Sequence, residues 1–553
     1  MPTIDDLEKL RSAMAEERAT WDVDFKDIAR HLFPRGVRFD TQDANKGGKK
    51  STRIIDNTAV HAVNIGTSAM FTGTANPSRP WFDMKFRSPK LVDNQAGRAY
   101  LQDVKDVLAN ILTKSNFYDQ LPRLIKNLFV FGSGAMPVLE DSEDVVRFDS
   151  FPIGTFVWAS NYKGRIDALS RIYRMSIKQM AQQFGEDALS SRQRGEVRDK
   201  QKAETSVDVV WTVCPNADHK PGNDLDKFKR FGSYYYQLGD GNDGRTKFLR
   251  QSGFDEFPIL GARWGVTGED SWGTGPGHEV LDDTKELYQL HLMKAKGNSR
   301  GISPPLLLPS TMQGKVNLLP DALNYSVGMD TSGVRSIYQG STYDGSAMLE
   351  MINDTRGRIR SGLFQDLFLM FANSDRRQIT AAEIVARNQE KVLVLANVLE
   401  RLNQEVFDPL IDRLFGIAQR RGLLPEPPSD LEGEDIAIEY ISTMAQESKQ
   451  TGIAAIDRFA GFINGLAAVN PSVLDKVDFD QAIDEVASML GVPARIVKSD
   501  EQVAFERDQR AQQQAQRQAM ETMESGAKAA RDLSQANTSG DNALADLLAA
   551  GPR

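Results

Sequence analysis

The sequence predicts an α+β fold divided among several domains, and three observations support this. The chain has 553 residues, several times the length of one typical domain, and can therefore bury a large core. Short runs of strand-forming residues fill the region up to about residue 270, separated by the hairpin turns NYKG and GDGNDG. Beyond His278, apolar residues return at helical spacing over long stretches. Strands followed by long helices indicate an α+β arrangement.

Composition and charge exclude several classes of protein. Hydrophobic residues make up 40% of the chain and charged residues 26%, as in ordinary soluble globular proteins. A net charge of -9 argues against a surface that binds nucleic acid over most of its area, and leaves room only for local basic patches. No apolar run is long enough to span a bilayer. The N-terminus lacks the pattern of a secretory signal, and the single cysteine, Cys214, cannot form an intramolecular disulfide. We therefore expect no membrane role and assembly in a reducing cytoplasm.

The first predicted element is one long amphipathic helix that begins after Thr3 and ends near Pro34. Thr3 can cap this helix, with Asp6 three residues further on. Its apolar positions recur every seven residues at Leu7, Met14, Trp21 and Ile28. The following segment, 40–53, is polar, basic and rich in glycine, and we interpret it as an exposed loop rather than a phosphate-binding loop.

A second helix is predicted from Ile54 until Asn76 and Pro77 stop it. Small residues share one of its faces, at Ala59, Ala62, Gly66, Ala69 and Gly73. Such a face permits the close approach of another segment. Apolar and polar residues then alternate from Phe82 to Phe86, which predicts a half-buried strand.

A third helix is predicted from Tyr118 to Phe131, where Gly132 and Gly134 break it. Strands are predicted next at Ala135–Leu139, Val145–Phe148, Phe156–Ala159, Arg165–Arg174, Val207–Val213, Tyr234–Leu238 and Thr246–Arg250. These strands complete the predicted α+β region.

Long helices dominate the rest of the chain. One is predicted from His278 to about Gly297, and another carries an apolar stripe from Leu349 to Met370. Thr380 and Glu383 form a capping box that opens a further helix. That helix is predicted to reach about Arg421, with a kink at Pro409 and an end at Gly422. The remaining predicted elements are a compact β-rich insertion after Gly297, a strand at Ile436–Ile441, a small helical unit at 443–492 and a solvated or intersubunit helix from 500 to about 535.

Reactive groups suited to an enzyme are scarce in this chain. None of its five histidines is paired at a metal-ligand spacing, and we expect His278 and His291 at the surface rather than in a catalytic role. Cys214 is interpreted as a small buried hydrophobe. An acidic hairpin turn could in principle hold magnesium for nuclease chemistry, although such a tip is usually only solvated; its members are Glu140, Asp141, Glu143 and Asp144. We predict no catalytic residue, no metal site and no cofactor.

Several longer segments, taken in their order along the chain, resemble the head-to-tail connecting proteins, or portals, of short-tailed bacteriophages. The resemblance covers about residue 15 to residue 445 and is weaker in the C-terminal hundred residues. It is carried by SAMFTGTANPSRPWFDM, NLFVFGSGAMPVLED, YKGRIDALSRIYRMSIKQMAQQFG, FPILGARWGVTGEDSWGTGPGHEVLDD, TAAEIVARNQEKV, NQEVFDPLIDRLF and GLLPEPPSDL. Each segment alone is a weak signal, but their order and spacing together are specific.

The resemblance implies a portal-type fold that assembles into a ring of twelve copies at one capsid vertex. Double-stranded DNA would pass through the ring during packaging and ejection. The implied parts are a wing at 1–274, a first stem helix at 275–298, a clip at 299–344, a second stem helix at 345–372, a tunnel loop at 373–379, a return through the wing at 380–442 with a long helix and a strand, a crown at 443–495 and a C-terminal helical barrel or flexible tail at 496–553.

The resemblance also suggests which residues carry the function. The tunnel loop would contact DNA through Asn373, Ser374, Asp375, Arg376, Arg377 and Gln378. Arg376 and Arg377 are the best candidates for contact with passing phosphates, and intersubunit salt bridges with Asp375 or Glu383 are the alternative. Candidates for lining the channel along the stem are Lys294, Lys296, Arg356, Arg358 and Arg360. The clip residues expected to dock the motor and adaptors are Pro304, Pro305, Leu306, Leu307, Leu308 and Pro309.

The implied partners are other copies of the chain, the terminase packaging motor, a tail adaptor, and the major capsid and scaffolding proteins. Double-stranded DNA would be bound without sequence preference, and the protein would reside in the virion after assembly in the host cytoplasm. One alternative is another structural head or tail component, such as an adaptor ring. The other is a DNA-packaging enzyme, for which the sequence offers neither a nucleotide-binding loop nor a metal cluster.

Overall fold

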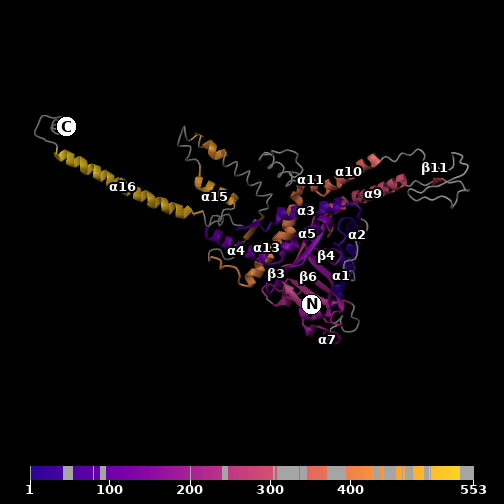
Figure 1. Ribbon diagram of the computed structural model, residues 1–553. Coiled ribbons are helices and arrows are strands. Elements are labelled where there is room, and N and C mark those ends of the chain that lie inside the picture. The colour runs from indigo at the N-terminus through magenta and orange to yellow at the C-terminus, as the bar shows by residue number, and fades with distance from the viewer. Residues whose placement is uncertain are drawn as a thin grey trace. The chain divides into compact units, whose positions relative to one another are not determined.

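The computed structural model describes most of the chain, and the described residues belong to two units. One unit comprises Met1–Arg87 and Asp103–Ser448, and the other comprises Ser88–Gln102 and Lys449–Arg553 (Figure 1). Helices and sheets both contribute, so the predicted α+β class is confirmed. The residues that the structure describes are 2–40, 54–78, 80–86, 95–199, 201–223, 225–238, 247–302, 306–307, 335–336, 345–369, 394–428, 436–440, 456, 458–463, 465–466, 477–490, 497–498 and 500–535.

The N-terminus forms two helices, α1 (Ile4–Ala19) and α2 (Asp22–His31). The predicted cap at Thr3 is confirmed. The Asp6 amide donates to the Thr3 hydroxyl, and the Asp6 carboxylate accepts the Thr3 amide, so the two residues form a capping box. The prediction of a single long helix is wrong.

The break between the two helices lies at Thr20 and Trp21. The Thr20 hydroxyl donates to the Glu17 carbonyl, and the Trp21 amide donates to the carbonyl of Arg18, three residues back. This tighter turn ends α1. It also brings the Trp21 ring onto Phe25, with 6.2 Å between centroids. The seven-residue apolar repeat continues across the break, which is why the pattern resembles one helix.

The helix of small residues, α3 (Thr58–Thr74), packs against α5 (Phe117–Phe131). The predicted close approach of another segment to this face is confirmed at Gly66, where a Cβ would lie 2.5 Å from the Phe129 ring. The strand predicted after Pro80 is also confirmed: β1 (Phe82–Phe86) pairs with β12 (Ile436–Tyr440) in antiparallel register.

The largest sheet has five antiparallel strands in sequential order. They are β4 (Phe156–Ser160), β5 (Ile166–Ser176), β6 (Ser206–Pro215), β7 (Phe231–Gln237) and β8 (Arg250–Phe254). α1 covers one face of this sheet, where Leu7 and Met14 pack with Val210 and Tyr236. The last strand was predicted at Thr246–Arg250 but begins only at Arg250. It pairs with Phe231–Tyr235 of β7, and this pairing sets where the strand begins.

A three-stranded sheet lies next along the first unit, in the order β3-β2-β9. Its strands are β3 (Val145–Phe148), β2 (Ser133–Asp141) and β9 (Ile259–Arg263), and the first two confirm the predicted hairpin. β2 begins directly after α5, where Gly132 ends the helix with a positive φ of 67°.

Glycines allow two backbone segments to cross at this point. A Cβ on Gly132 would lie 2.4 Å from the Gly273 carbonyl oxygen, and one on Gly277 would lie 2.0 Å from the Val130 carbonyl oxygen. Only glycine permits such contact. The crossing fixes the segment that leads into α8 (Pro276–Glu279) and the long helix α9 (Leu281–Ile302).

The second long helix, α10, spans Gly345–Gly362 and is followed by the single turn α11 (Gln365–Phe368). The prediction of one continuous helix over 345–372 is wrong within its described part. Phe364 adopts a left-handed conformation with φ 54°, which interrupts the helix. Its ring contacts Phe129 and Trp264, so aromatic packing offsets the backbone strain.

A helix over 394–402 continues through a π-helical turn at Asn403–Phe407 into α13 (Asp408–Arg420). The described part of the helix predicted from Thr380 to about Arg421 is thereby confirmed, with its irregularity directly before Pro409 and its end at Gly422, whose φ is 63°. The capping box at Thr380 and Glu383 lies outside the described residues.

The second unit contains α15 (Phe479–Leu490) and α16 (Asp500–Gln535). Side chains along α16 are exposed almost throughout, as expected of a solvated or intersubunit helix. No helix in the described part of the chain is long and apolar enough to cross a membrane.

The remaining elements are α4 (Gln95–Lys114), which the sequence analysis missed, α6 (Ile177–Phe184), η2 (Glu186–Ala188), α7 (Ser191–Val197), η3 (Asp226–Phe228), β10 (Leu306–Leu307) and β11 (Arg335–Ser336).

Candidate functional site

The hairpin of α9 and α10 is the candidate functional site, because it carries the charged residues that the sequence suggested for lining a channel. These are Lys294, Lys296, Arg356, Arg358 and Arg360. The two helices lie side by side and are antiparallel (Figure 1). Gly362 at the end of α10 contacts Val280 just before α9, and Arg358 reaches back to Asp283 and Glu286.

Arg358 joins the two helices through acidic side chains. Its guanidinium lies 3.2 Å from Asp283 and 2.5 Å from Glu286 on α9, and 3.7 Å from Asp354 one turn back on α10. The cross-helix side chains are between about a third and a half exposed, so solvent screens these pairs and each adds little stability. Their effect is to set the register between the helices.

A buried carboxylate, Asp56, holds both helices to the segment that precedes α3. Its Oδ1 accepts the Thr58 amide at 2.8 Å. Its Oδ2 accepts two bonds from Arg356 on α10, at 2.6 and 3.0 Å, and lies 3.0 Å from Nε2 of His291 on α9. The Asp56 side chain is only 5% exposed. One carboxylate therefore connects three segments that are far apart in the sequence.

The charge of Asp56 is stabilised despite its burial. Burial alone would raise the pKa of this carboxyl, but hydrogen bonds from Thr58 and Arg356 outweigh it and lower the pKa to about 2. Asp56 is therefore ionised at neutral pH, when it offsets the charge of Arg356.

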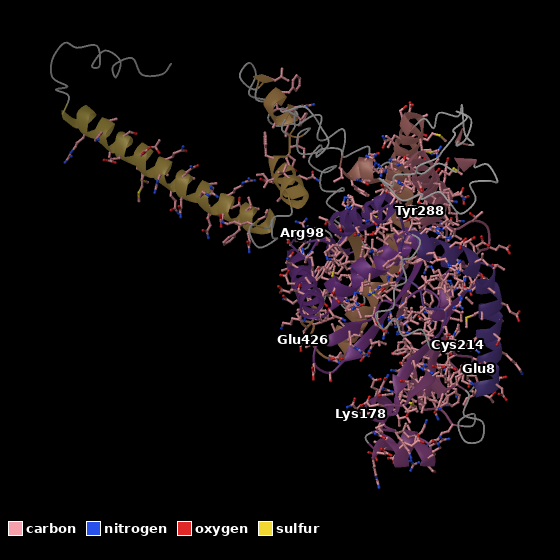
Figure 2. The ribbon with its side chains drawn as sticks, turned by 45° about the vertical axis from the view of Figure 1, so that its right-hand side comes forward. Glu8, Arg98, Lys178, Cys214, Tyr288 and Glu426 are labelled. Atoms are coloured by element: carbon pink, nitrogen blue, oxygen red, sulfur yellow. The ribbon has the colours of Figure 1, made fainter. Side chains whose placement is uncertain are left out.

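α9 is also attached to α2, at the base of the hairpin. The Tyr288 hydroxyl donates to the His31 carbonyl at 3.0 Å, and the two rings stack with 5.5 Å between centroids. Burial raises the pKa of Tyr288, so its hydroxyl stays protonated as a donor. Lys285 lies 3.4 Å from Asp27. Figure 2 labels Tyr288 where the hairpin meets the body of the unit.

The expectation that His278 lies at the surface is wrong, whereas His291 is partly exposed, with its Nε2 beside Asp56. His278 Nδ1 accepts the Gly275 amide at 3.2 Å, and its ring edge packs on Trp21 and Phe25. Its Nε2 is buried and has no hydrogen-bond partner among the described groups. Burial lowers the pKa of His278, which favours the neutral ring. Helical spacing could not reveal this, because the covering rings, from Trp21 at the N-cap of α2 and Phe25 within it, are remote in sequence.

The other predicted stem residues differ in their surroundings. The Nε of Arg360 donates to the Arg356 carbonyl at 3.3 Å, while Lys294 is half-buried and Lys296 exposed. Large apolar side chains accompany them on the exposed faces of the hairpin, at Leu292, Met293, Leu349 and Met351. Such a concentration of exposed apolar groups is typical of a surface that other protein covers.

The two predicted loop sites lie largely outside the described residues. This holds for the whole tunnel loop, Asn373–Gln378, and for Pro304, Pro305, Leu308 and Pro309 of the clip. Leu306 and Leu307 form β10, which pairs with Arg335 and Ser336 of β11.

Sequence reasoning missed Asp56, the residue on which the hairpin's attachment depends. The available signal was weak: an aspartate two residues before a helix is common as a local cap, and its long-range partners lie beyond residue 290. Cys214, in contrast, is confirmed as buried, and burial raises the pKa of its thiol to about 11. Within the described ranges, no three His, Cys, Asp or Glu side chains are grouped so as to hold a metal ion.

Comparison with known proteins gives a consistent result along the chain. A family model described as "Bacteriophage head to tail connecting protein" matches residues 5–497. The chain is 37% identical over 543 residues to the portal protein of Salmonella phage epsilon15, which covers 97% of this chain and 96% of the relative. It is 34% identical over 536 residues to a probable portal protein of Bordetella phage BPP-1, with the same coverage.

Proposed function

Because the chain belongs to the family of bacteriophage head to tail connecting proteins, we propose that it forms the portal ring at one vertex of a phage capsid. In this role it is a structural component through which double-stranded DNA enters the head during packaging and leaves during ejection. The observation that carries the proposal is how much of the chain is similar to portal proteins. The similarity includes the hairpin of α9 and α10 and the parts of the chain before and after it.

The exposed apolar side chains of the hairpin support a ring. Leu292, Met293, Leu349 and Met351 would be solvated in a single copy and covered when hairpins of neighbouring copies pack side by side. Asp56 and Tyr288 fix the hairpin to the body, so that every copy presents these side chains in the same position. In the ring, α9 and α10 are the stem.

The charge of the chain suits a conduit in which DNA slides. Each copy contributes -9, which repels phosphate over most of the channel. Every fixed phosphate contact would add affinity that opposes movement, so few cations should face the DNA. We assign this role to Arg376 and Arg377 of the tunnel loop, with Lys294, Lys296 and Arg360 along the stem. Arg356 and Arg358, also proposed from the sequence, have carboxylate partners within the chain and serve mainly to position the helices.

The remaining parts are assigned to docking and to the head interior. Residues 299–344, with Pro304, Pro305 and Pro309, form the clip for the terminase motor and later the tail adaptor. Residues 1–274 and 380–442 form the wing, which contacts capsid and scaffolding proteins. Residues 443–495 form the crown, and α16 extends the channel as a helical barrel.

Labelling of particles would test the location directly. Gold-conjugated antibody against this chain is applied to heads whose tails have been removed, and to intact virions as a control for access. The proposal predicts label at a single vertex of the head and much weaker label when the tail is attached. Label spread over the whole shell, or along the tail, would contradict it.

A further inference from the structure

Two leucines of the hairpin lie at the same level on opposite sides of it. Arg358 on α10 lies 3.2 Å from Asp283 on α9, so these two residues are close to level with one another. Leu292 comes nine residues after Asp283, and Leu349 comes nine residues before Arg358. Nine residues are two and a half helical turns. Each leucine therefore faces away from the other helix, and the two are level because α9 and α10 are antiparallel.

Both leucines are open to solvent in a single copy. Leu292 is 48% exposed and Leu349 is 43% exposed. Gln289 lies one turn from Leu292 on α9, and Asn353 lies one turn from Leu349 on α10; both are exposed. We call Gln289 and Leu292 the α9 edge, and Leu349 and Asn353 the α10 edge. At each level a leucine on one edge corresponds to a leucine on the other, and an amide corresponds to an amide.

A glycine continues the α10 edge toward the base of the hairpin. Gly357 lies four residues after Asn353, inside α10, where glycine weakens a helix. A Cβ on Gly357 would meet nothing within 4 Å, so packing within one copy does not require glycine there. Gly362 differs, because its Cβ would lie 2.6 Å from Val280. Close approach of a neighbouring copy along the α10 edge gives Gly357 a role.

The charges of the hairpin change sign along each helix, in opposite directions. Near the base, α9 has three carboxylates and one lysine, while α10 has three arginines; toward the tip, α9 is basic and α10 is acidic. The residues are Asp282, Asp283, Lys285 and Glu286, then Arg356, Arg358 and Arg360, then Lys294 and Lys296, and finally Glu350 and Asp354. Several of them are already paired within the copy, so they favour one arrangement of helices rather than forming new ion pairs. Opposite signs meet where α9 of one copy lies beside α10 of another, whereas two α9 helices at the same level would repel.

We propose that the α9 edge of one copy packs on the α10 edge of the neighbouring copy, so that Leu292 meets Leu349 and Gln289 meets Asn353. This inference rests on the proposed ring and deepens it by naming the two surfaces that meet and their register. A closed ring joins two different surfaces of each copy. Rotation about the ring axis also leaves each residue at its height along that axis. With the hairpin along the channel, residues that are level within a copy are therefore level between copies, as the two edges require.

Cysteine cross-linking tests the contact and its register. A chain with both Leu292→Cys and Leu349→Cys is assembled, oxidised by air with a copper catalyst and run on a non-reducing denaturing gel. A disulfide requires Cα atoms about 4.4–6.8 Å apart, and the two edges of one copy face away from each other, so the bond can form only between copies. We expect a ladder of linked copies that extends to the full ring. The native Cys214 is buried, and the wild-type chain should give no ladder.

Matched cysteine variants check that the link is specific. Each single-cysteine chain should stay unlinked on its own, and an equal mixture of the two should give linked pairs and nothing larger, because each copy then has one new cysteine. Combining Leu292→Cys with Ser361→Cys moves the second cysteine about 18 Å along α10 to another exposed position, and should give little product. Linked pairs from Leu292→Cys alone would indicate a two-fold contact between α9 helices and would overturn the proposal.

A second test uses the open glycine. Gly357→Leu should leave the Tm of the dissociated chain unchanged or higher, because leucine favours a helix and has room in a single copy. It should raise the concentration needed for half-maximal ring assembly by on the order of tenfold, because the added side chain enters the contact between copies. Gly195→Leu is the control: Gly195 is an exposed glycine of α7 with nothing within 4 Å of its Cβ, and assembly should not change. Light scattering measures assembly.

The outcomes separate this inference from the proposed function. A ladder no stronger than that of the Ser361→Cys combination, or a Gly357→Leu chain that assembles at the wild-type concentration, would overturn the contact and leave the portal proposal standing. A wild-type chain that never forms a ring, even together with capsid and scaffolding proteins, would contradict both.

Discussion

At the residue scale, Asp56 joins both helices of the hairpin to the segment that precedes α3. Its carboxylate accepts hydrogen bonds from Thr58 and Arg356 and lies beside His291. The pKa of Asp56 is lowered to about 2 from an ordinary 3.8, so its contribution to stability is complete above about pH 4 and is lost as the pH falls toward 2.

Replacing Asp56 should therefore destabilise the first unit. Asp56→Ala removes the shared acceptor and leaves Arg356 without its counter-charge, which should cost about 2 kcal/mol of unfolding free energy at neutral pH. The shift of the urea midpoint, followed by tryptophan fluorescence, measures the effect. Asp354→Ala removes a 72% exposed carboxylate from the same hairpin and should cost below about 0.5 kcal/mol. Equal losses in the two variants would contradict the assigned role of Asp56.

His278 should make stability depend on pH. Burial lowers its pKa below the ordinary 6.5, so the folded state binds the proton less readily than the unfolded chain. Its contribution is present above pH 6.5 and is lost as the pH falls below that value. His278→Asn should flatten the dependence of Tm on pH between about 7.5 and 5 relative to wild type. Parallel curves for both proteins would show that His278 does not titrate in this way.

Single residues could be predicted from the sequence where their contacts are with near neighbours in the chain. They could not be predicted where their contacts come from distant segments. The cap formed by Thr3 and Asp6 is local, and it was predicted. The burial of His278 depends on Trp21 and Phe25, and its surface placement was therefore wrong. Asp56 was missed for the same reason.

At the scale of elements, the close backbone contact between Gly132 and the segment from Gly273 to Gly277 fixes where the hairpin of α9 and α10 begins. Gly132→Ala should destabilise strongly, by about 3 kcal/mol or more, because its φ is positive and its Cβ would overlap the backbone of Gly273 and Thr274. Gly164→Ala is the control: its φ is 73° but nothing lies within 4 Å of the added atom, so it should cost only about 1 kcal/mol. Thermal unfolding of both variants measures the difference. Similar Tm losses would mean that strain alone, and not the crossing, matters.

Most strands and long helices were predicted because their periodicity is strong, as for β1 and α5. The breaks within helices were not predicted. Apolar spacing continues across Thr20 and across Phe364, while the interruption depends on a side-chain bond to the backbone in one case and on aromatic packing in the other. The start of β8 was misplaced because pairing with β7, not local pattern, selects it.

At the scale of the molecule, the exposed apolar side chains of the hairpin should matter for assembly and not for folding. Met351 is 51% exposed, so Met351→Glu should leave Tm nearly unchanged but raise the concentration for ring assembly by on the order of tenfold. Val23→Glu, at a 67% exposed position on α2, serves as the control and should have little effect on either. Analytical ultracentrifugation measures assembly. A Met351→Glu chain that assembles as readily as wild type would exclude the hairpin face from the contact.

The α+β class and the family could be predicted from the sequence, because long segments keep their order over most of the chain. The candidate site could be predicted only in outline. The helices of the hairpin were located, but the carboxylates that engage Arg356 and Arg358 come partly from other elements and were not foreseen. Periodicity identifies a helix and its apolar face, and it carries no information about remote charge partners.

The mass and rotational symmetry of the purified particle show whether the chain forms a ring. Light scattering gives the mass, and class averages of electron micrographs give the symmetry. We expect closed rings of about twelve copies with a hole along the axis, as for a repeated heterologous contact. A chain that remains a single copy, even when produced together with capsid and scaffolding proteins, would overturn the portal proposal.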